Sequence, residues 1–163
     1  MRAALAALAI AAASPVAAQE RYLGVFVGSQ HIGSDAYNDF NPGLTLGYRW
    51  PVGTGSTEWH AEGGVFYNSY EEVSPIGVVG LSTGVAQLAG GEIRLGASVG
   101  IARYAELSQI VKEKYEIPTF GDYLPIAALT GSWRRDGVAY RLSVLPYGDD
   151  VDGVVNFSLA FDF

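Results

Sequence analysis

The stretch EIRLGASVGI, residues 92–101, alternates apolar and polar side chains without interruption. Its odd-numbered positions carry Ile93, Leu95, Ala97, Val99 and Ile101. The positions between them carry charged, small or polar residues, including Glu92, Arg94 and Ser98. A period of two is the side-chain period of a β-strand, so this stretch predicts a strand with one apolar and one polar face.

The final segment, VVNFSLAFDF at residues 154–163, repeats the pattern. Its apolar face carries Val155, Phe157, Leu159, Phe161 and the terminal Phe163. An aromatic residue that ends such an alternating segment resembles the C-terminal signal by which outer-membrane barrels are recognised for assembly. The segment therefore favours a barrel over a soluble sandwich.

Similar segments along the chain predict eight strands in total. They are residues 22–30, 43–50, 58–68, 76–87, 92–101, 124–133, 138–145 and 154–163. A transmembrane strand needs about nine to eleven residues, which these segments approach. We therefore predict an all-β fold, an eight-stranded antiparallel up-and-down transmembrane β-barrel.

The predicted connections alternate between short and long. The short ones, 51–57, 88–91 and 134–137, are expected as periplasmic turns, and the long ones, 31–42, 69–75, 102–123 and 146–152, are expected to open to the cell exterior. Within the longest connection, residues 105–116 are interpreted as a solvated loop in preference to a short helix. Aromatic residues near the strand ends predict the interfacial girdles of a membrane barrel, namely Trp50, Trp59, Tyr67, Tyr123, Trp133 and Tyr140.

Composition agrees with a barrel in lipid. Hydrophobic residues make up 49% of the chain, with 21 Gly and 10 Tyr, yet beyond the N-terminal residues no stretch has the length of a transmembrane helix. The chain has no Cys, which excludes disulfides and thiolate metal sites. A net charge of -7 with 10 Lys and Arg argues against a nucleic-acid partner.

The N-terminus predicts export. Arg2 precedes an apolar run from Ala3 to Ala13, and Val16, Ala17 and Ala18 form a small-residue cleavage site. We expect a signal peptide at residues 1–18 and an outer-membrane barrel domain at residues 19–163. The expected location is the outer membrane of a Gram-negative bacterium.

The residues on the inward faces of the predicted strands differ between the two ends of the barrel. Charged residues fall near the periplasmic end and are expected to pair across the lumen, namely Arg49, His60, Glu62, Glu92, Arg94 and Arg141. The outer half is expected to be narrow and largely apolar, with Phe26, Gly28, Phe66, Val78 and Gly80 among its residues. This glycine-rich half either packs tightly against its aromatic residues or leaves space for an acyl chain.

A collinear set of short motifs resembles the lipid A palmitoyltransferase family over nearly the whole mature chain. The set comprises Tyr37-Asn38, Asn68-Ser69, Pro75-Ile76 with Gly80, Leu124-Pro125-Ile126, Val144-Leu145-Pro146-Tyr147 and Phe163. The resemblance implies an eight-stranded outer-membrane barrel that moves a palmitoyl group from a phospholipid to lipid A. It also implies an interior pocket that measures the acyl chain.

Several residues take their expected roles from this resemblance. His31 and Ser69 match the family's rim histidine and serine, and Gly80 matches the floor of the pocket, whose walls are expected to include Val78, Phe26, Phe66 and Gly28. Pro125 and Pro146 match prolines that interrupt strand pairing, and with Pro42 they are expected to mark lateral lipid access, because proline lacks a ladder donor. The expected partners are phospholipid and lipid A, with no cofactor and a monomeric state.

The chain departs from the family at the rim. Asn68 stands where the family has an acid, the connection after His31 is shorter, and no amphipathic helix precedes the first strand. Acids on the same rim are candidate substitutes, namely Asp35, Asp39, Glu71 and Glu72. The mechanistic hypothesis has His31 as the general base for Ser69 or the acceptor hydroxyl, with Asn68 or a rim amide at the oxyanion.

Other functions stay open at this point. His31 and Ser69 are alternatively ordinary polar loop residues of a non-catalytic barrel with a structural, adhesion or lipid-binding role. A lipid A deacylase is a third hypothesis, less favoured because both histidines of this chain occur early. The acidic loop residues are alternatively a solvated rim or a site for divalent cations, although no ligand spacing specifies one.

Overall fold

The computed structural model describes residues 19–115, 119–146 and 152–163. The predicted signal peptide lies outside these residues. In the described part, no helix is long and apolar enough to cross a membrane.

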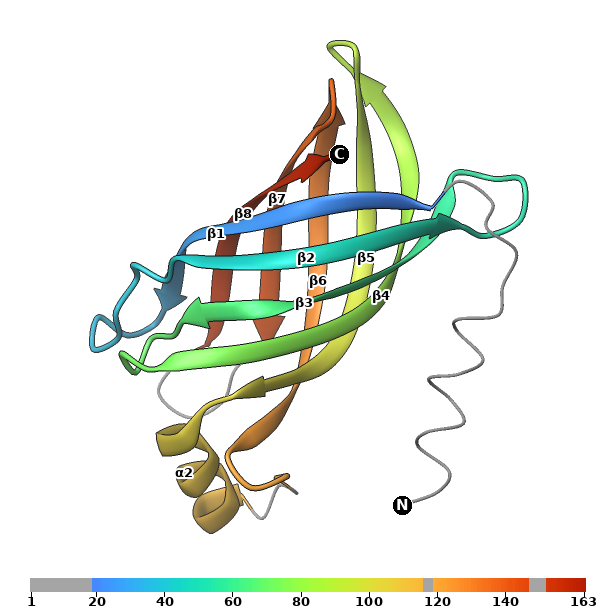
Figure 1. Cartoon of the computed structure of the whole chain (residues 1–163). Coiled ribbons are helices and arrows are strands. Elements are labelled where there is room, and N and C mark those ends of the chain that lie inside the picture. The colour runs from blue at the N-terminus through green and yellow to red at the C-terminus, as the bar shows by residue number, and fades with distance from the viewer. Residues whose placement is uncertain (1–18, 116–118, 147–151) are drawn as a thin grey trace, which may run out of the picture.

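The chain forms one closed antiparallel barrel in which each strand pairs with its neighbours in sequence and β1 closes on β8 (Figure 1). This confirms the predicted fold class. The strands are β1 (Glu20–Ile32), β2 (Gly43–Pro51), β3 (Thr57–Tyr67), β4 (Val73–Leu88), β5 (Gly91–Arg103), β6 (Tyr123–Arg135), β7 (Val138–Pro146) and β8 (Gly153–Asp162).

The outside of the barrel is apolar. Leu44, Leu95, Val99, Leu129 and Leu142 are each more than half exposed, and they come from four different strands. A water-soluble monomer does not expose a continuous apolar band of this kind. The surface is that of a β-barrel that crosses a membrane with its apolar face toward lipid, the type found in bacterial outer membranes.

Aromatic side chains border this band at the end that carries the short turns. Trp50 pairs with Trp59 across β2 and β3, and the rings of Trp133 and Tyr140 lie 5.6 Å apart across β6 and β7. Such residues prefer the boundary between hydrocarbon and water. They support the assignment of this end to one membrane interface.

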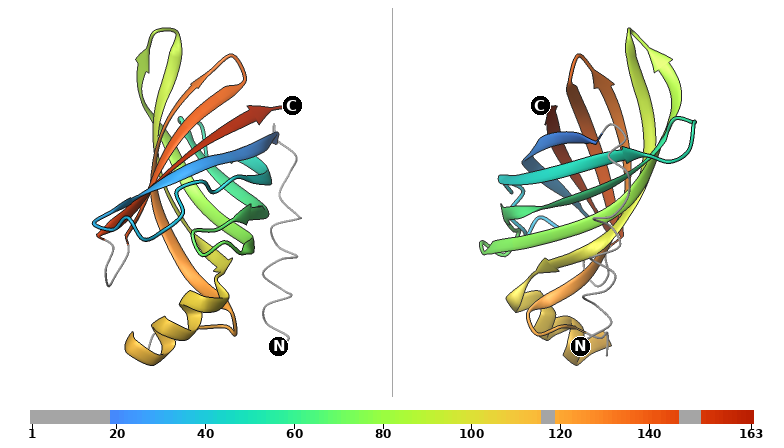
Figure 2. Two further views of the ribbon diagram at one scale, coloured as in Figure 1. Left: turned by 90° about the vertical axis from the view of Figure 1, so that its left-hand side faces the viewer. Right: turned by 45° about the vertical axis from the view of Figure 1, so that its right-hand side comes forward.

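The opposite end carries the long connections and the helix α2 (Ala105–Tyr115), as all three views show (Figures 1 and 2). This corrects the expectation of a solvated loop. The Glu72 carboxylate accepts a hydrogen bond of 3.0 Å from the Ala105 amide, and Leu107 and Ser108 are buried. An acid at the first turn and a buried face stabilise a helix that the polar sequence alone does not favour.

A β-bulge interrupts the pairing of β1 with β8. Phe26 pairs with Ser158 and Gly28 pairs with Phe157, so Val27 is an extra residue on β1. Beyond the bulge, each β1 side chain therefore points to the face opposite to the one that uninterrupted alternation would give it. His31 consequently faces inward and is only 7% exposed, whereas Gln30 is exposed.

Two pairs of neighbouring strands separate before they reach the end that carries the long connections, which is the end expected to face the cell exterior and is called the external end below. The ladder between β6 and β7 stops at Leu129 and Val144, although β6 begins at Tyr123. The ladder between β1 and β2 stops at Phe26 and Gly43, although β1 continues to Ile32. The barrel wall therefore has two seams without strand-to-strand ladder pairing near its external rim.

Candidate functional site

His31 joins two residues from different connections at the external rim. Its Nε2 atom lies 2.9 Å from Ser69 Oγ, and its Nδ1 atom lies 2.8 Å from Asp39 Oδ1. The imidazole is buried, Ser69 is half-buried, and the Asp39 side chain is about half exposed at 51%. The structure thus aligns a hydroxyl, an imidazole and a carboxylate in one chain of hydrogen bonds.

The direction of these hydrogen bonds follows from the chemistry of the groups. An ionised carboxylate only accepts, so Nδ1 carries the proton that faces Asp39. The lone pair of a neutral ring is then on Nε2, and the Ser69 hydroxyl donates to it. This is the arrangement in which a serine loses its proton to a histidine as it attacks a carbonyl carbon.

Asn68 builds the loop that presents Ser69, and it is fully buried. Its Oδ1 accepts from the amides of Tyr70 and Glu72 at 2.9 and 3.0 Å, and its Nδ2 donates to Ser74 Oγ at 2.8 Å. The hypothesis that Asn68 contacts the oxyanion therefore needs correction, because its amide group is occupied within the loop and does not line the lumen cavity. Asn68 positions Ser69.

The same contacts favour an asparagine over an acid at position 68. The Ser74 hydroxyl donates to the Arg103 carbonyl, so it presents a lone pair to residue 68. The Glu72 carboxylate also lies beside Asn68 Nδ2, at 3.5 Å. The Nδ2 group of Asn68 can donate to both the Ser74 and the Glu72 oxygen. A carboxylate at position 68 would instead face the lone pair of Ser74 and the negative charge of Glu72.

The residues just before β2 carry Asp39 to the histidine. The Asp39 carbonyl accepts a hydrogen bond of 2.8 Å from the Ser29 amide on β1, and the Asn38 amide donates to the Ser69 carbonyl at 3.4 Å. The segment therefore bridges β1 and the start of the β3–β4 connection. Asp39 was one of four candidate acids in the sequence, and the structure brings it to His31.

Aromatic rings lead from this site into the barrel. Tyr37 stacks on the His31 ring with centroids 5.1 Å apart, and Tyr37, Tyr70, Tyr104, Phe66 and Phe26 follow one another at 5.5 to 6.2 Å. Burial raises the pKa of the Tyr104 phenol above its ordinary value, so this ring stays neutral. The entrance beneath Ser69 is thus uncharged and apolar.

A cavity of about 160 Å³ runs down the lumen from Ser69. Its outer part is lined by Phe26, Phe66, Ile76, Val78, Ala102, Tyr104, Ile126 and Leu145. Of the residues expected in an acyl pocket, Phe26, Phe66 and Val78 line this cavity. Gly80 lies behind the His60 ring, because a Cβ at Gly80 would come within 2.6 Å of His60 Cε1.

Gly28 does not line the cavity, contrary to the expectation. It pairs with Phe157, which faces lipid, because the bulge shifts β1 by one residue after Phe26. Alternation counted from the sequence cannot anticipate a bulge, since the extra residue is set by pairing with β8.

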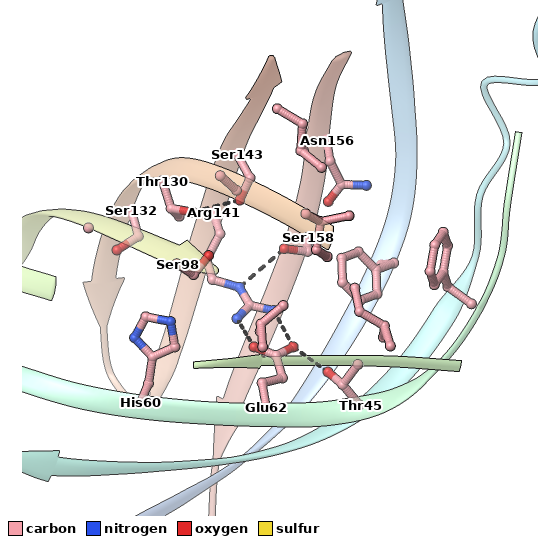
Figure 3. A pocket seen from close by; sticks show the side chains of 18 of the residues that line it. Thr45, His60, Glu62, Ser98, Thr130, Ser132, Arg141, Ser143, Asn156 and Ser158 are labelled. Carbon is pink, nitrogen blue, oxygen red and sulfur yellow. Dashed lines mark hydrogen bonds and ion pairs between the residues drawn. The ribbon is translucent and has the colours of Figure 1, made fainter. Parts of the chain in front are cut away.

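Below the apolar part, a belt of hydroxyl and amide groups lines the lumen, formed by Ser98, Thr130, Ser132, Ser143, Asn156 and Ser158 (Figure 3). The Glu62 carboxylate and the Arg141 guanidinium form a cross-lumen ion pair beside it, with Arg141 Nη1 to Glu62 Oε2 at 2.7 Å. Tyr22 and Thr45 also donate to Glu62, and Arg141 donates to Ser158. The apolar part of the cavity therefore ends at this belt.

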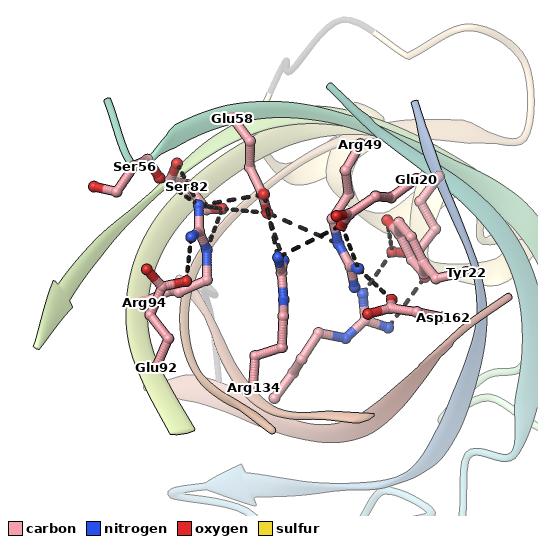
Figure 4. A network of polar contacts seen from close by, with 12 residues as sticks. Glu20, Tyr22, Arg49, Ser56, Glu58, Ser82, Glu92, Arg94, Arg134 and Asp162 are labelled. Carbon is pink, nitrogen blue, oxygen red and sulfur yellow. Dashed lines mark hydrogen bonds and ion pairs between the residues drawn. The ribbon is translucent and has the colours of Figure 1, made fainter. Parts of the chain in front are cut away.

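Charged residues close the end that carries the short turns, and of the lumen charges expected from the sequence all but His60 form ion pairs (Figure 4). Arg134 Nη2 donates to Glu58 Oε1 at 2.5 Å, Arg94 pairs with Glu92 and Glu58, and Arg49 pairs with Asp162. Arg49 also lies over the Tyr22 ring, 4.1 Å from its centroid.

The three expected access prolines lie at the seams. Pro125 is on β6 before its ladder with β7 begins, and Pro146 ends β7 beyond the last pair. Pro42 precedes β2, and its carbonyl accepts from the Tyr67 amide at 2.8 Å. Lateral entry through these seams stays a prediction.

Among the residues that the structure describes, no group of three or more His, Asp or Glu side chains is placed to hold a metal ion. Sequence reasoning did not single out Asn41 or Tyr104, which also line the cavity. Neither residue belongs to an alternating segment, so no periodic signal marked them.

The chain is similar to the solved structure of the Yersinia pestis outer membrane protein Ail in a phospholipid bilayer nanodisc, with 12% identity and a TM-score of 0.47 over 90% of this chain and 100% of that one. No family model and no curated protein matches it. The resemblance to lipid A palmitoyltransferases therefore stays a prediction.

Proposed function

We propose that this protein is an outer-membrane acyltransferase that moves a fatty acyl chain from a phospholipid to lipid A at the external rim. The observation that carries the proposal is the hydrogen-bonded chain of Ser69, His31 and Asp39 at the mouth of the lumen cavity. Each group alone is common in a surface connection. Their alignment over an apolar cavity in a membrane wall is what acyl transfer from a lipid requires.

In the proposed first step, His31 Nε2 takes the proton of the Ser69 hydroxyl as Ser69 Oγ attacks the ester carbonyl carbon of the phospholipid. Asp39 stabilises the imidazolium through its hydrogen bond to Nδ1. When the tetrahedral intermediate collapses, the ester C–O bond breaks and His31 returns the proton to the leaving lysophospholipid oxygen. The acyl group is then bonded to Ser69.

In the second step, a lipid A hydroxyl gives its proton to His31 and attacks the acyl-serine carbonyl. The bond to Ser69 Oγ breaks, and the proton passes from His31 to Ser69. Neither step uses a cofactor or involves a net oxidation. The same residues serve both steps. Water in place of the lipid A hydroxyl would give hydrolysis.

The depth of the apolar part of the lumen also bears on the length of the acyl chain that the protein would transfer. Seven residues separate Ser69 from Glu62 along β3 and its connection, which at a tilt of about 45° corresponds to a depth of roughly 16 Å. The Glu62–Arg141 ion pair and the polar belt end the apolar compartment at that level. We propose that the methyl end of the acyl chain stops above this pair, because burying methylenes against hydroxyl groups that need partners is unfavourable.

The proposal is tested by mass spectrometry of lipid A from cells that express the protein, its Ser69→Ala, His31→Ala and Asp39→Asn variants, and a control. The control is Asp35→Asn, which makes the same change of charge at an exposed acid of the same connection. Heat-dependent migration in gels verifies that each variant assembles as a barrel.

We expect lipid A to gain one acyl chain with the native protein and with Asp35→Asn. We expect that gain to be absent with Ser69→Ala and His31→Ala, and reduced by about 10²-fold or more with Asp39→Asn. A loss of one acyl chain from lipid A would identify a deacylase instead. An unchanged spectrum from assembled protein would reject both enzymes.

A non-catalytic barrel is the second candidate, and one observation favours it. The His31 contacts also fasten the β1–β2 connection to the β3–β4 connection, because Asp39 and Ser69 belong to different connections. A structural, adhesion or lipid-binding barrel would use the same bonds to hold its rim closed. Under that function, Ser69→Ala lowers stability and leaves every lipid unchanged.

A further inference from the structure

Asn41 carries a buried hydrogen-bond donor that no group of the described chain satisfies. The residue is only 2% exposed, and its Nδ2 atom has no hydrogen-bond partner. Two other buried polar atoms among the described residues share this property, Arg134 Nε and Asn156 Oδ1, and they belong to strand residues that line the lumen. Buried donors are nearly always paired, so an unpaired one that lines a cavity is available to a group that occupies the cavity.

The orientation of the Asn41 amide is set by β1. The Ser29 hydroxyl donates a hydrogen bond to Asn41 Oδ1, which holds the oxygen of the amide against the barrel wall. The Nδ2 group therefore points away from Ser29. Both residues line the same cavity as Ser69.

Backbone contacts place Asn41 beside the serine. The Pro42 carbonyl accepts from the Tyr67 amide at 2.8 Å, and the Asn38 amide donates to the Ser69 carbonyl at 3.4 Å. These two bonds flank Asn41 and hold its segment against residues 67–69. Asn41 is also two residues from Asp39 in the same connection. The exposed Phe40 lies between them and faces outward.

We propose that the side-chain amide of Asn41 donates a hydrogen bond from Nδ2 to the oxyanion that forms when Ser69 attacks an ester carbonyl. The inference rests on the proposed function and adds a catalytic residue to it. A fixed donor that waits for a developing negative charge stabilises the transition state more than the substrate. The proposal also explains the unpaired donor, whose partner is the carbonyl oxygen of the bound lipid.

The test compares Asn41→Asp and Asn41→Ala with the native protein in a purified ester-cleavage assay. Asn41→Asp keeps the size of the side chain and the oxygen that Ser29 contacts, and it replaces the donor by an acceptor. Two nitrophenyl esters of one acyl chain serve as probes, one with an ordinary carbonyl and one with a thiocarbonyl. Sulfur is a weaker acceptor, so the ratio of the two rates reports donation to the oxyanion and not general stability.

We expect Asn41→Asp and Asn41→Ala to lower kcat for the ordinary ester by about 10²- to 10³-fold with little change in KM. The rate ratio between the two esters should fall toward that of the uncatalysed reactions. A Ser29→Ala variant should give a smaller loss, because Nδ2 is kept and only its orientation is released.

The outcomes separate this inference from the proposed function. If the native protein cleaves the ester, Ser69→Ala is inactive, and Asn41→Asp keeps the native kcat and rate ratio, then the oxyanion role of Asn41 is overturned alone. If Ser69→Ala retains the native rate, the proposed function fails and the inference fails with it.

Discussion

Gly28 pairs with Phe157 of β8, whereas an uninterrupted ladder from Phe26 would pair it with Asn156. This one-residue bulge lets Phe26, Ser29 and His31 all face the lumen, although their spacing does not follow a period of two. The catalytic proposal depends on it, because a histidine on the lipid face could not meet Ser69.

Two single-residue deletions in β1 test the role of the bulge. Deletion of Val27 removes the extra residue and leaves His31 on the inner face, so we expect most of the acyl transfer to be retained. Deletion of Gln30, which lies beyond the bulge, moves His31 to the outer face, and we expect transfer to fall by about 10²-fold or more. Lipid A mass spectrometry measures both. Equal activity of the two variants would contradict the argument.

The substitution Asn68→Asp tests whether an acid at this position would improve the site. We expect it to lower the free energy of unfolding by about 1–3 kcal/mol, because the donor to Ser74 is lost and a charge is buried beside Glu72. Transfer should also fall, since the loop that holds Ser69 is disturbed. Urea unfolding and lipid A analysis report the two effects.

Asn38→Asp provides the matched control for this substitution, because it makes the same chemical change in a rim residue whose side chain contacts only its own turn. We expect little effect there. A gain of activity in Asn68→Asp would instead show that an acid at this position takes part in the chemistry.

A disulfide tests lipid entry between β6 and β7, and the absence of native Cys makes the experiment clean. Ala128 and Leu145 lie one residue beyond the last pair of this ladder, Leu129 with Val144. We expect oxidation of the Ala128→Cys, Leu145→Cys variant to reduce transfer several-fold, with recovery on reduction.

A cross-link within the existing ladder is the control for the seam. Gly131→Cys with Leu142→Cys joins residues that are already paired and leaves the seam as it is. Transfer should not depend on its oxidation state. Full activity of the oxidised Ala128–Leu145 cross-link would exclude this seam as the route.

The polar belt predicts a change in acyl-chain selection. Thr130 and Ser143 hydroxyls lie 2.8 Å apart in the lumen. Replacing both, as Thr130→Val with Ser143→Ala, removes two polar groups together and should change stability little. We expect the acyl chains on lipid A to become longer, as the apolar compartment extends downward.

Thr57→Val with Thr83→Val removes a similar hydroxyl pair, 3.1 Å apart, that does not line the cavity. We expect the native chain-length profile from this control. Identical profiles for both double variants would show that the belt does not limit the chain.

The architecture follows from the amino-acid sequence. Alternation in residues 92–101 and 154–163 predicts two-faced strands, and their number, the short and long connections and the aromatic residues at strand ends together predict a closed barrel in lipid. The confirmed fold shows that this reasoning suffices, because strand faces depend on neighbouring residues and on which side meets hydrocarbon. The same alternation also predicts which charged residues face the lumen.

The candidate site, by contrast, depends on contacts that exist only in the folded barrel. The bulge that turns His31 inward is set by pairing with β8, and Asp39 reaches His31 through a segment held by both β1 and the β3–β4 connection. Ser69 lies 38 positions from His31, and Asn68 has its role through Ser74 and Glu72. These contacts arise when the barrel closes and packs its rim, and local periodicity carries no information about which side chains then meet.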